Sequence, residues 1–329
     1  MDVLFKPANK EITVSASSSL LEALIANNIP ISYSCLAGRC GTCRCKVLEG
    51  DIIGPSAAEG SLAQNGHYVL ACQSRVQSGG IVEIPEPDEI ILHPTKTLKA
   101  VVSAYQPLSD DVRCLRLKLG KAFDYSPGQF ANLTFWEKDG ARPYSMAGIS
   151  GDGELEFHIR IVADGRVTSK LDGLLKVGSV VKLNGPLGAS YLRRKNTDPI
   201  LCVATGTGLS PILSVIRGAL ESGMPNKINL IFGGRTEHDL YGLERLAQLA
   251  ALYKNFQYRL CAIHVTTEKS YFQGLVTEAI SQYFPSLYNW RVYLAGSPAM
   301  VEAASLVCTK RGANVEHIYA DAFYPASYD

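Results

Sequence analysis

Short runs in which apolar and polar residues alternate dominate the middle third of the chain. Glycine and proline separate these runs, which cover residues 98–106, 112–119, 129–135, 154–162 and 179–186. Alternation with a period of two is typical of strands with one buried face, and the turn residues between them favour antiparallel neighbours. The pattern therefore predicts an antiparallel β-barrel or sandwich.

The last third shows a different pattern, in which short apolar runs alternate with segments whose apolar residues recur at helical spacing. The predicted strands are residues 199–205, 228–234, 257–265, 290–296 and 315–321. The predicted helices are residues 211–222, 241–253, 274–284 and 298–310. Such alternation predicts a parallel sheet with helices on both faces.

The first ninety residues mix both patterns. Ser19 and Glu22 have the spacing of a capping box at the start of a helix over 19–28. Predicted strands cover residues 3–7, 11–15, 43–50 and 81–85, so a small α+β unit is expected. A proline-rich stretch at 84–96 and a polar stretch at 192–199 separate the patterns, which predicts domains at 1–92, 96–194 and 197–329.

Bulk properties narrow the classes of function. A formal net charge of +1 over 329 residues gives no reason to expect nucleic acid or an anionic membrane as partner. The N-terminal segment lacks the apolar core of a signal peptide, and no apolar run is long enough to span a membrane. Nine cysteines in such a chain predict a cytoplasmic protein without a disulfide framework.

Four closely spaced cysteines point to specific chemistry. Cys35, Cys40 and Cys43 form a C-x4-C-x2-C pattern, and Cys72 follows 29 residues later. This is the ligand spacing of plant-type [2Fe–2S] ferredoxins, and the small residues between the cysteines let backbone N–H groups approach the sulfurs. Cys45 shares a strand face with Cys43, and we interpret it as a buried structural residue.

Two other interpretations of these cysteines are weaker. Structural zinc usually needs two pairs of short spacing, whereas this chain has one, and a zinc site would make it a non-redox binding module. A thioredoxin-like pair would stand between a strand and a helix, but Cys43 leads into a strand. The remaining cysteines are expected in the core: Cys114, Cys202, Cys261 and Cys308.

Several motifs downstream are typical of nucleotide binding. RPYSMAG at 142–148, GRVTSK at 165–170 and GPLG at 185–188 lie in the barrel region. ATGTGLSP at 204–211 follows a predicted strand and opens a helix, so its glycines let the backbone approach a pyrophosphate. Each motif alone is a modest signal, and their order makes them specific.

Together with ISYSCLAGRCGTCRCKV, YVLACQ, YLAGSPAMVEA and HIYADAFYP, these motifs resemble the ferredoxin–NADP reductase superfamily. More narrowly, the whole chain is similar to the reductases of aromatic-ring-hydroxylating dioxygenase systems. The resemblance implies a β-grasp [2Fe–2S] ferredoxin domain, an antiparallel β-barrel FAD domain and a Rossmann-like NAD domain with a parallel sheet.

The resemblance also assigns residues. Arg142 would bind the FAD pyrophosphate, Tyr144 would stack on the isoalloxazine and the Ser145 hydroxyl would face flavin N5. Phe323, with Tyr324 as the alternative, would shield the ring. Ala295 departs from the family, which often has cysteine there. Further cofactor contacts would come from Gly165, Arg166, Val167, Thr168, Gly206, Thr207, Gly208 and Gly296.

The preference for NADH or NADPH is open from the residues. Arg235 and Thr236 follow the second strand of the nucleotide domain and suit a 2′-phosphate, whereas Glu237 and Asp239 favour NADH. Because the family mostly prefers NADH, we expect NADH, with NADPH as the alternative.

The resemblance implies an electron-transfer oxidoreductase. Hydride from NADH would pass to FAD, and single electrons would leave through the [2Fe–2S] cluster. The expected partners are a Rieske-type ferredoxin and the terminal oxygenase of a dioxygenase system, and we expect a monomer. The alternative is the reductase of a di-iron or other multicomponent monooxygenase, which donates directly to its hydroxylase.

Overall fold

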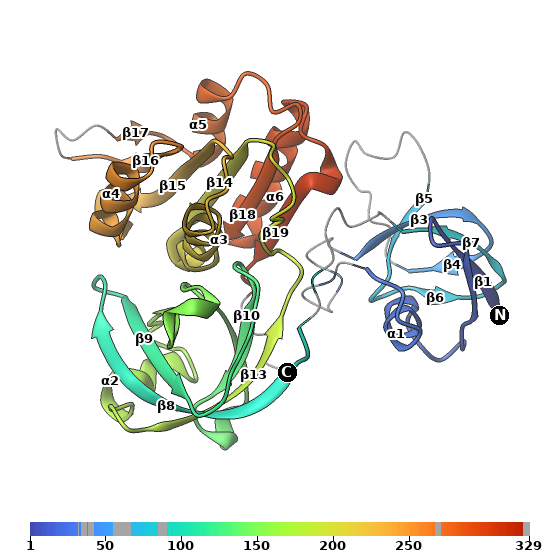
Figure 1. Cartoon of the computed structure of the whole chain (residues 1–329), viewed down its shortest axis with the longest axis horizontal. Coiled ribbons are helices and arrows are strands. Elements are labelled where there is room, and N and C mark those ends of the chain that lie inside the picture. The colour runs from blue at the N-terminus through green and yellow to red at the C-terminus, as the bar shows by residue number, and fades with distance from the viewer. Residues whose placement is uncertain are drawn as a thin grey trace. The chain divides into compact units, whose positions relative to one another are not determined.

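The structure is a computed structural model that describes residues 1–31, 33, 38, 43–54, 67–84, 91, 93–266 and 271–324. The chain divides into two compact units, residues 1–90 and residues 91–329 (Figure 1). Within the described residues, no helix has the length and apolar character needed to cross a membrane.

The first unit is a mixed sheet packed against one helix. The sheet has the order β2 (Lys10–Thr13), β1 (Asp2–Lys6), β7 (Gly80–Glu83), β3 (Arg44–Glu49) and β5 (His67–Leu70). β1 and β7 are parallel and the other neighbours antiparallel. The short strands β4 (Ile52–Ile53) and β6 (Arg75–Val76) form a separate pair.

Helix α1 (Leu20–Ala26) starts as its capping residues predict. The Glu22 backbone N–H donates to Ser19 Oγ at 3.2 Å, and the Ser19 N–H donates to Glu22 Oε2 at 2.7 Å. Leu20 and Leu24 are fully buried among the inward-facing residues of the sheet. One helix packed on a mixed sheet in this order is the expected β-grasp arrangement.

The second unit begins with a nearly closed antiparallel barrel. Its order is β11 (Arg142–Ser145), β10 (Phe130–Thr134), β13 (Val180–Leu187), β8 (Lys96–Pro107), β9 (Val112–Leu119) and β12 (Leu155–Arg160). The two end strands meet at a bridge between Met146 and Phe157, so the sheet curls back on itself. β11 is not among the strands predicted from alternation, because Arg-Pro-Tyr-Ser is short and contains proline.

The barrel is followed by a parallel sheet that carries two helices on each face. The sheet order is β17 (Phe272–Gln273), β16 (Phe256–His264), β15 (Ile228–Thr236), β14 (Ile200–Thr205), β18 (Arg291–Gly296) and β19 (Ile318–Ala322). α3 (Leu209–Glu221) and α4 (Leu243–Leu252) share one core cluster, whereas α5 (Val276–Tyr283) and α6 (Pro298–Lys310) share the other. The predicted α/β architecture is confirmed, with α3 starting two residues before its predicted start.

Candidate flavin and nicotinamide site

The parallel sheet reverses its direction of growth between β14 and β18. From β14 the chain adds β15 and β16 on one side, and it then returns to add β18 and β19 on the other side. In open α/β sheets, ligands bind in the crevice at the carboxyl ends of the strands where the order reverses. This topology places the binding crevice at Thr205, at the end of β14, and Gly296, at the end of β18.

Two glycines at this crevice allow the loops after β14 and β18 to meet. A Cβ on Gly208 would overlap the carbonyl oxygen of Ala295, and a Cβ on Gly296 would overlap Thr205 Oγ1. Gly208 also precedes α3, whose first turn has no capping side chain. The short turn η5 (Gly206–Gly208) runs directly into α3, and the Leu209 N–H already bonds to the Gly206 and Thr207 carbonyls. Because the first N–H groups of a helix lack partners within it, those of η5 are the donors that fit a pyrophosphate.

Arg142 and Tyr144 lie on one face of the barrel strand β11. The Arg142 guanidinium is partly exposed, and its Nη1 donates to the neighbouring Ala141 carbonyl at 2.9 Å. The Tyr144 ring meets Phe135 edge-on, with 6.0 Å between the ring centroids. Burial raises the pKa of Tyr144 to about 12, so the phenol stays neutral and presents an aromatic wall.

The predicted pyrophosphate loop starts at Gly165. The Val162 N–H donates to Thr168 Oγ1 at 3.2 Å, and a short helical turn, η4 (Thr168–Lys170), begins there. Lys170 donates to both carboxylate oxygens of the buried Asp139, each at 2.9 Å. Since Asp139 lies in the loop that leads into β11, this ion pair joins the two segments that carry the predicted FAD contacts.

Ser145, the last residue of β11, connects this barrel strand to the parallel sheet. The side chain is buried, and its Oγ donates to Asp321 Oδ2 at 3.1 Å. Asp321 lies on β19 beside Ala295, and the Phe323 N–H donates to the Gly296 carbonyl at 2.8 Å. The structure therefore brings Ser145, Gly296 and Phe323 to one place.

Asp321 is a site residue that the sequence analysis missed. Burial raises the pKa of Asp321 to about 6, and the hydrogen bond from Ser145 only partly offsets this effect. A carboxyl group that titrates close to neutral pH beside a predicted catalytic hydroxyl is a candidate for holding a proton. The signal available in the sequence was an acid two residues before Phe323.

Replacing Asp321 with Asn should change how stability depends on pH. The native carboxyl holds its proton up to about pH 6, whereas the unfolded one loses it near pH 3.8, so wild-type stability falls as pH rises through this window. Asp321→Asn removes that loss and should gain up to about 3 kcal/mol over wild type by pH 8. Urea unfolding at saturating FAD measures the difference, and a gain that does not grow with pH would contradict the raised pKa of Asp321.

The two acidic side chains near Arg235, Glu237 and Asp239, already accept hydrogen bonds from other residues of the chain. Glu237 is buried, and its Oε1 accepts from Thr266 N at 3.0 Å and from Thr266 Oγ1 at 2.6 Å. These hydrogen bonds lower the pKa of Glu237 to about 2. Asp239 Oδ2 accepts from the N–H of Thr236 at 2.7 Å, whereas Arg235 is exposed at the end of β15.

Cys43 and Cys72 lie next to each other in the first unit. The Cys72 N–H donates to Cys43 Sγ at 3.5 Å, which is the kind of contact that a cluster thiolate needs. Gly38 has a φ of +70°, and a Cβ there would lie 2.6 Å from Gln73 Cγ, so Gly38 lies close to the residue after Cys72. Cys35 and Cys40, the other two predicted ligands, lie outside the described residues.

Cys45 has the surroundings of a structural residue. Its side chain is fully buried, and burial raises the pKa of the thiol far above its usual range. This burial fits a packing role for Cys45. The donor set that remains, two adjacent cysteines with a backbone N–H on one sulfur, fits a [2Fe–2S] cluster.

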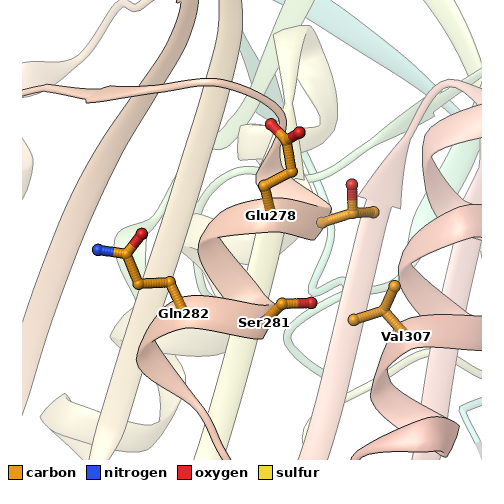
Figure 2. A pocket seen from close by; sticks show the side chains of 5 residues that line it. Glu278, Ser281, Gln282 and Val307 are labelled. Carbon is orange, nitrogen blue, oxygen red and sulfur yellow. The ribbon is translucent and has the colours of Figure 1, made fainter.

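A separate open pocket of about 500 Å³ lies between α5 and α6 (Figure 2). Glu278, Ser281 and Gln282 line it from α5, and Val307 faces them from α6. None of the predicted site residues lines this pocket. It therefore does not belong to the crevice at the strand ends.

Three family models match the chain in sequence. They are a 2Fe-2S iron-sulfur cluster binding domain at residues 5–77, an oxidoreductase FAD-binding domain at 99–191 and an oxidoreductase NAD-binding domain at 202–306. Together they define an oxidoreductase of the iron–sulfur flavoprotein class, with FAD, a [2Fe–2S] cluster and NADH as cofactors.

Comparison with known proteins narrows this class. The chain is 48% identical to the reductase component of the naphthalene 1,2-dioxygenase system of Pseudomonas putida, over 99% of both chains. It is 30% identical to the reductase component of phenol 2-monooxygenase of Pseudomonas sp. (strain CF600), over 99% of this chain and 95% of that one. Among solved structures, the cytochrome P450 reductase GcoB of Amycolatopsis matches with a TM-score of 0.75 and 29% identity, over 99% of both chains. The chain belongs to the family of ferredoxin–NAD(P)+ reductase components of aromatic-ring dioxygenase systems.

Proposed function

We propose that this protein is the reductase of a naphthalene dioxygenase-like system and passes electrons from NADH to a Rieske-type ferredoxin. The observation that carries the proposal is the full-length similarity to the Pseudomonas putida reductase component, through all three cofactor domains. The limits 1–92, 96–194 and 197–329 are our proposed domain boundaries.

The residues around the crevice have separate tasks in this proposal. When bound, FAD accepts a hydride and releases electrons singly, which matches a two-electron donor to a one-electron cluster. Arg142 and the loop Gly165–Arg166–Val167–Thr168 would hold its pyrophosphate, since guanidinium and backbone N–H groups suit that anion. Tyr144 would form one wall of the flavin pocket, and Phe323 would cover the opposite face.

Ser145 and Asp321 would orient the reacting groups for the hydride step. Ser145 Oγ lies 3.1 Å from Asp321 Oδ2, and both groups stand where β11 meets the ends of β18 and β19. The hydroxyl would orient the reacting face, and the carboxylate would fix the direction of that hydroxyl. The pyrophosphate of the nicotinamide cofactor would be bound by Gly206, Thr207, Gly208 and Gly296.

NADH is the proposed donor, with NADPH as a second substrate. Glu237 is turned toward Thr266, and Asp239 is bonded to Thr236, so Arg235 is the exposed charge at the end of β15. An exposed guanidinium there suits a 2′-phosphate. This arrangement supports tolerance of NADPH.

Arg235→Ala should therefore weaken the reaction with NADPH selectively. Loss of a charge-assisted hydrogen bond of about 1.5–3 kcal/mol would lower kcat/KM for NADPH roughly 10- to 100-fold. The value for NADH serves as the internal control and should stay near that of the wild type. Steady-state kinetics with both cofactors tests this, and equal losses with NADH and NADPH would contradict the role of Arg235.

The partner is tested by direct reduction. A purified Rieske ferredoxin from a naphthalene dioxygenase system, mixed with the protein and NADH without oxygen, should be reduced at catalytic rates. The second candidate function, direct donation to a hydroxylase, is favoured by the similarity to the phenol 2-monooxygenase reductase. If the protein reduced a phenol hydroxylase directly and transferred no electrons to the Rieske ferredoxin, the proposed dioxygenase role would be overturned.

The proposed protein is a cytoplasmic monomer that acts without a membrane or nucleic acid. The seven described cysteines form no disulfide with one another, which suits a reducing compartment. The terminal oxygenase would be reached through the ferredoxin.

A further inference from the structure

Helix α3 contacts β11 and the segment after it through one row of polar side chains. Ser210, Ser214 and Arg217 follow one another at spacings of four and three residues, so they lie on one face of the helix. Ser210 is 1% exposed, Ser214 0% and Arg217 9%. Polar residues on a buried helix face need partners, and here all of them have partners in the barrel or its loops, to which Arg217 adds Glu221 on α3 itself.

The two serines bond to the backbone that follows the predicted flavin contacts. Ser210 Oγ donates to the carbonyl of Ser145 at 2.7 Å, and Ser214 Oγ donates to the carbonyl of Gly148 at 2.5 Å. Ser214 Oγ also accepts from the Gly128 N–H at 3.3 Å. Each hydroxyl therefore links α3 directly to β11 or to the segment that follows it.

Arg217 completes the row with a charged contact. Its Nη1 and Nη2 donate to the two carboxylate oxygens of Asp152 at 2.6 and 2.7 Å, and its Nε donates to Glu221 at 2.7 Å. Burial opposes ionisation of Asp152, but the hydrogen bonds from Arg217 and from the Ile149 N–H outweigh it and lower the pKa of Asp152. The bidentate geometry fixes the orientation of the helix as well as its position.

We propose that Ser210, Ser214 and Arg217, the α3 clamp, are positioning residues that set the distance between the nicotinamide and the flavin. The predicted pyrophosphate site, Gly206–Gly208, runs directly into α3, and Ser210 is the second residue of α3. The same Ser145 that bonds Asp321 through its side chain is bonded to Ser210 through its carbonyl. Ser145 on the flavin side is therefore bonded to two elements of the nicotinamide side, β19 and α3.

This inference rests on the FAD and nicotinamide positions of the proposed function. The three clamp side chains bond to protein groups, so their loss should leave NADH affinity at the helix end largely intact. It should instead misplace the nicotinamide relative to the flavin. A misplacement of about 1 Å is enough to slow a reaction roughly 100-fold.

The test compares the double variant S210A/S214A with S222A, both as FAD-loaded full-length protein. Ser222 is a matched control at the end of the same helix, because its hydroxyl bonds only within α3, to Gly218 at 2.6 Å and to Ala219 at 3.2 Å. Stopped-flow absorbance measures the rate of flavin reduction by NADH per bound FAD. The long-wavelength charge-transfer absorbance of the NADH complex reports nicotinamide–flavin stacking independently of turnover.

S210A/S214A should reduce its flavin about 10- to 100-fold more slowly at saturating NADH, lose charge-transfer absorbance and keep its dissociation constant for NADH. S222A should match the wild type in all three measurements.

An unchanged rate per bound FAD, even with a lowered melting temperature, would overturn the clamp and leave only a structural role for the two serines. Should the double variant not fold, S210A alone removes the bond in the first turn and is judged by the same readouts. A wild-type protein whose flavin NADH does not reduce would contradict the proposed function itself, and the clamp with it.

Discussion

Cys72→Ser should abolish electron transfer to one-electron protein acceptors while NADH oxidation by a two-electron dye continues near the wild-type rate. Cys72 and Cys43 are adjacent, with the Cys72 N–H on Cys43 Sγ at 3.5 Å, so the substitution removes one of four predicted thiolates from the cluster. Serine oxygen is a poorer ligand than thiolate for iron in such clusters. The flavin and nicotinamide residues belong to the other compact unit, which keeps its own core.

Cys45→Ala is the matched control for this experiment. Cys45 lies two residues from Cys43 and is fully buried, but it is interpreted as packing. Its loss should lower the melting temperature slightly and leave both the iron content and the transfer to a Rieske ferredoxin unchanged. Transfer that survives in Cys72→Ser, or disappears in Cys45→Ala, would contradict the ligand assignment.

Ser145→Ala should have the second largest effect, a fall of roughly 100-fold in the rate of flavin reduction by NADH. The substitution removes the hydroxyl that bonds to Asp321, and it leaves this half-buried carboxyl without that hydrogen-bond donor. The backbone carbonyl that receives Ser210 is retained, so the α3 clamp stays in place.

Stopped-flow measurements with NADH and with C4-deuterated NADH separate this effect from binding. The isotope effect should be at least as large in Ser145→Ala as in the wild type, because hydride transfer becomes the slow step. Ser103→Ala is a suitable control, since Ser103 bonds Glu154 at 3.0 Å on another part of the barrel. A Ser145→Ala rate equal to that of Ser103→Ala would show that the hydroxyl has no part in the hydride step.

Local sequence patterns predicted most of the fold. The capping box of Ser19 and Glu22 formed as expected, and the alternation of strands and helices after residue 199 gave the right sheet and both helix layers. β11 escaped prediction, because its chain direction is set by pairing with β10 and not by its own alternation. Periodicity reports burial along an element, and it carries no information on an element that has too few residues to show a period.

The site divides in the same way between local and distant contacts. Cysteine spacing and the glycine motif are local, so the sequence could indicate them. Asp321 lies 176 residues from Ser145, and Ser210 lies 65 residues from it, so only the fold brings these partners together. The sequence left the choice between NADH and NADPH open, because the partner of Glu237, Thr266, is 29 residues away.

The central claim is that one chain takes hydride from NADH onto FAD and releases single electrons through a [2Fe–2S] cluster. Titrating the purified protein with NADH under argon, with absorbance and EPR followed together, tests this most directly. The flavin absorbance should bleach, an EPR signal of a reduced [2Fe–2S] centre should grow, and full reduction should need about 1.5 equivalents of NADH for a two-electron and a one-electron carrier. A colourless protein that holds zinc, or flavin that bleaches without any cluster signal, would contradict it.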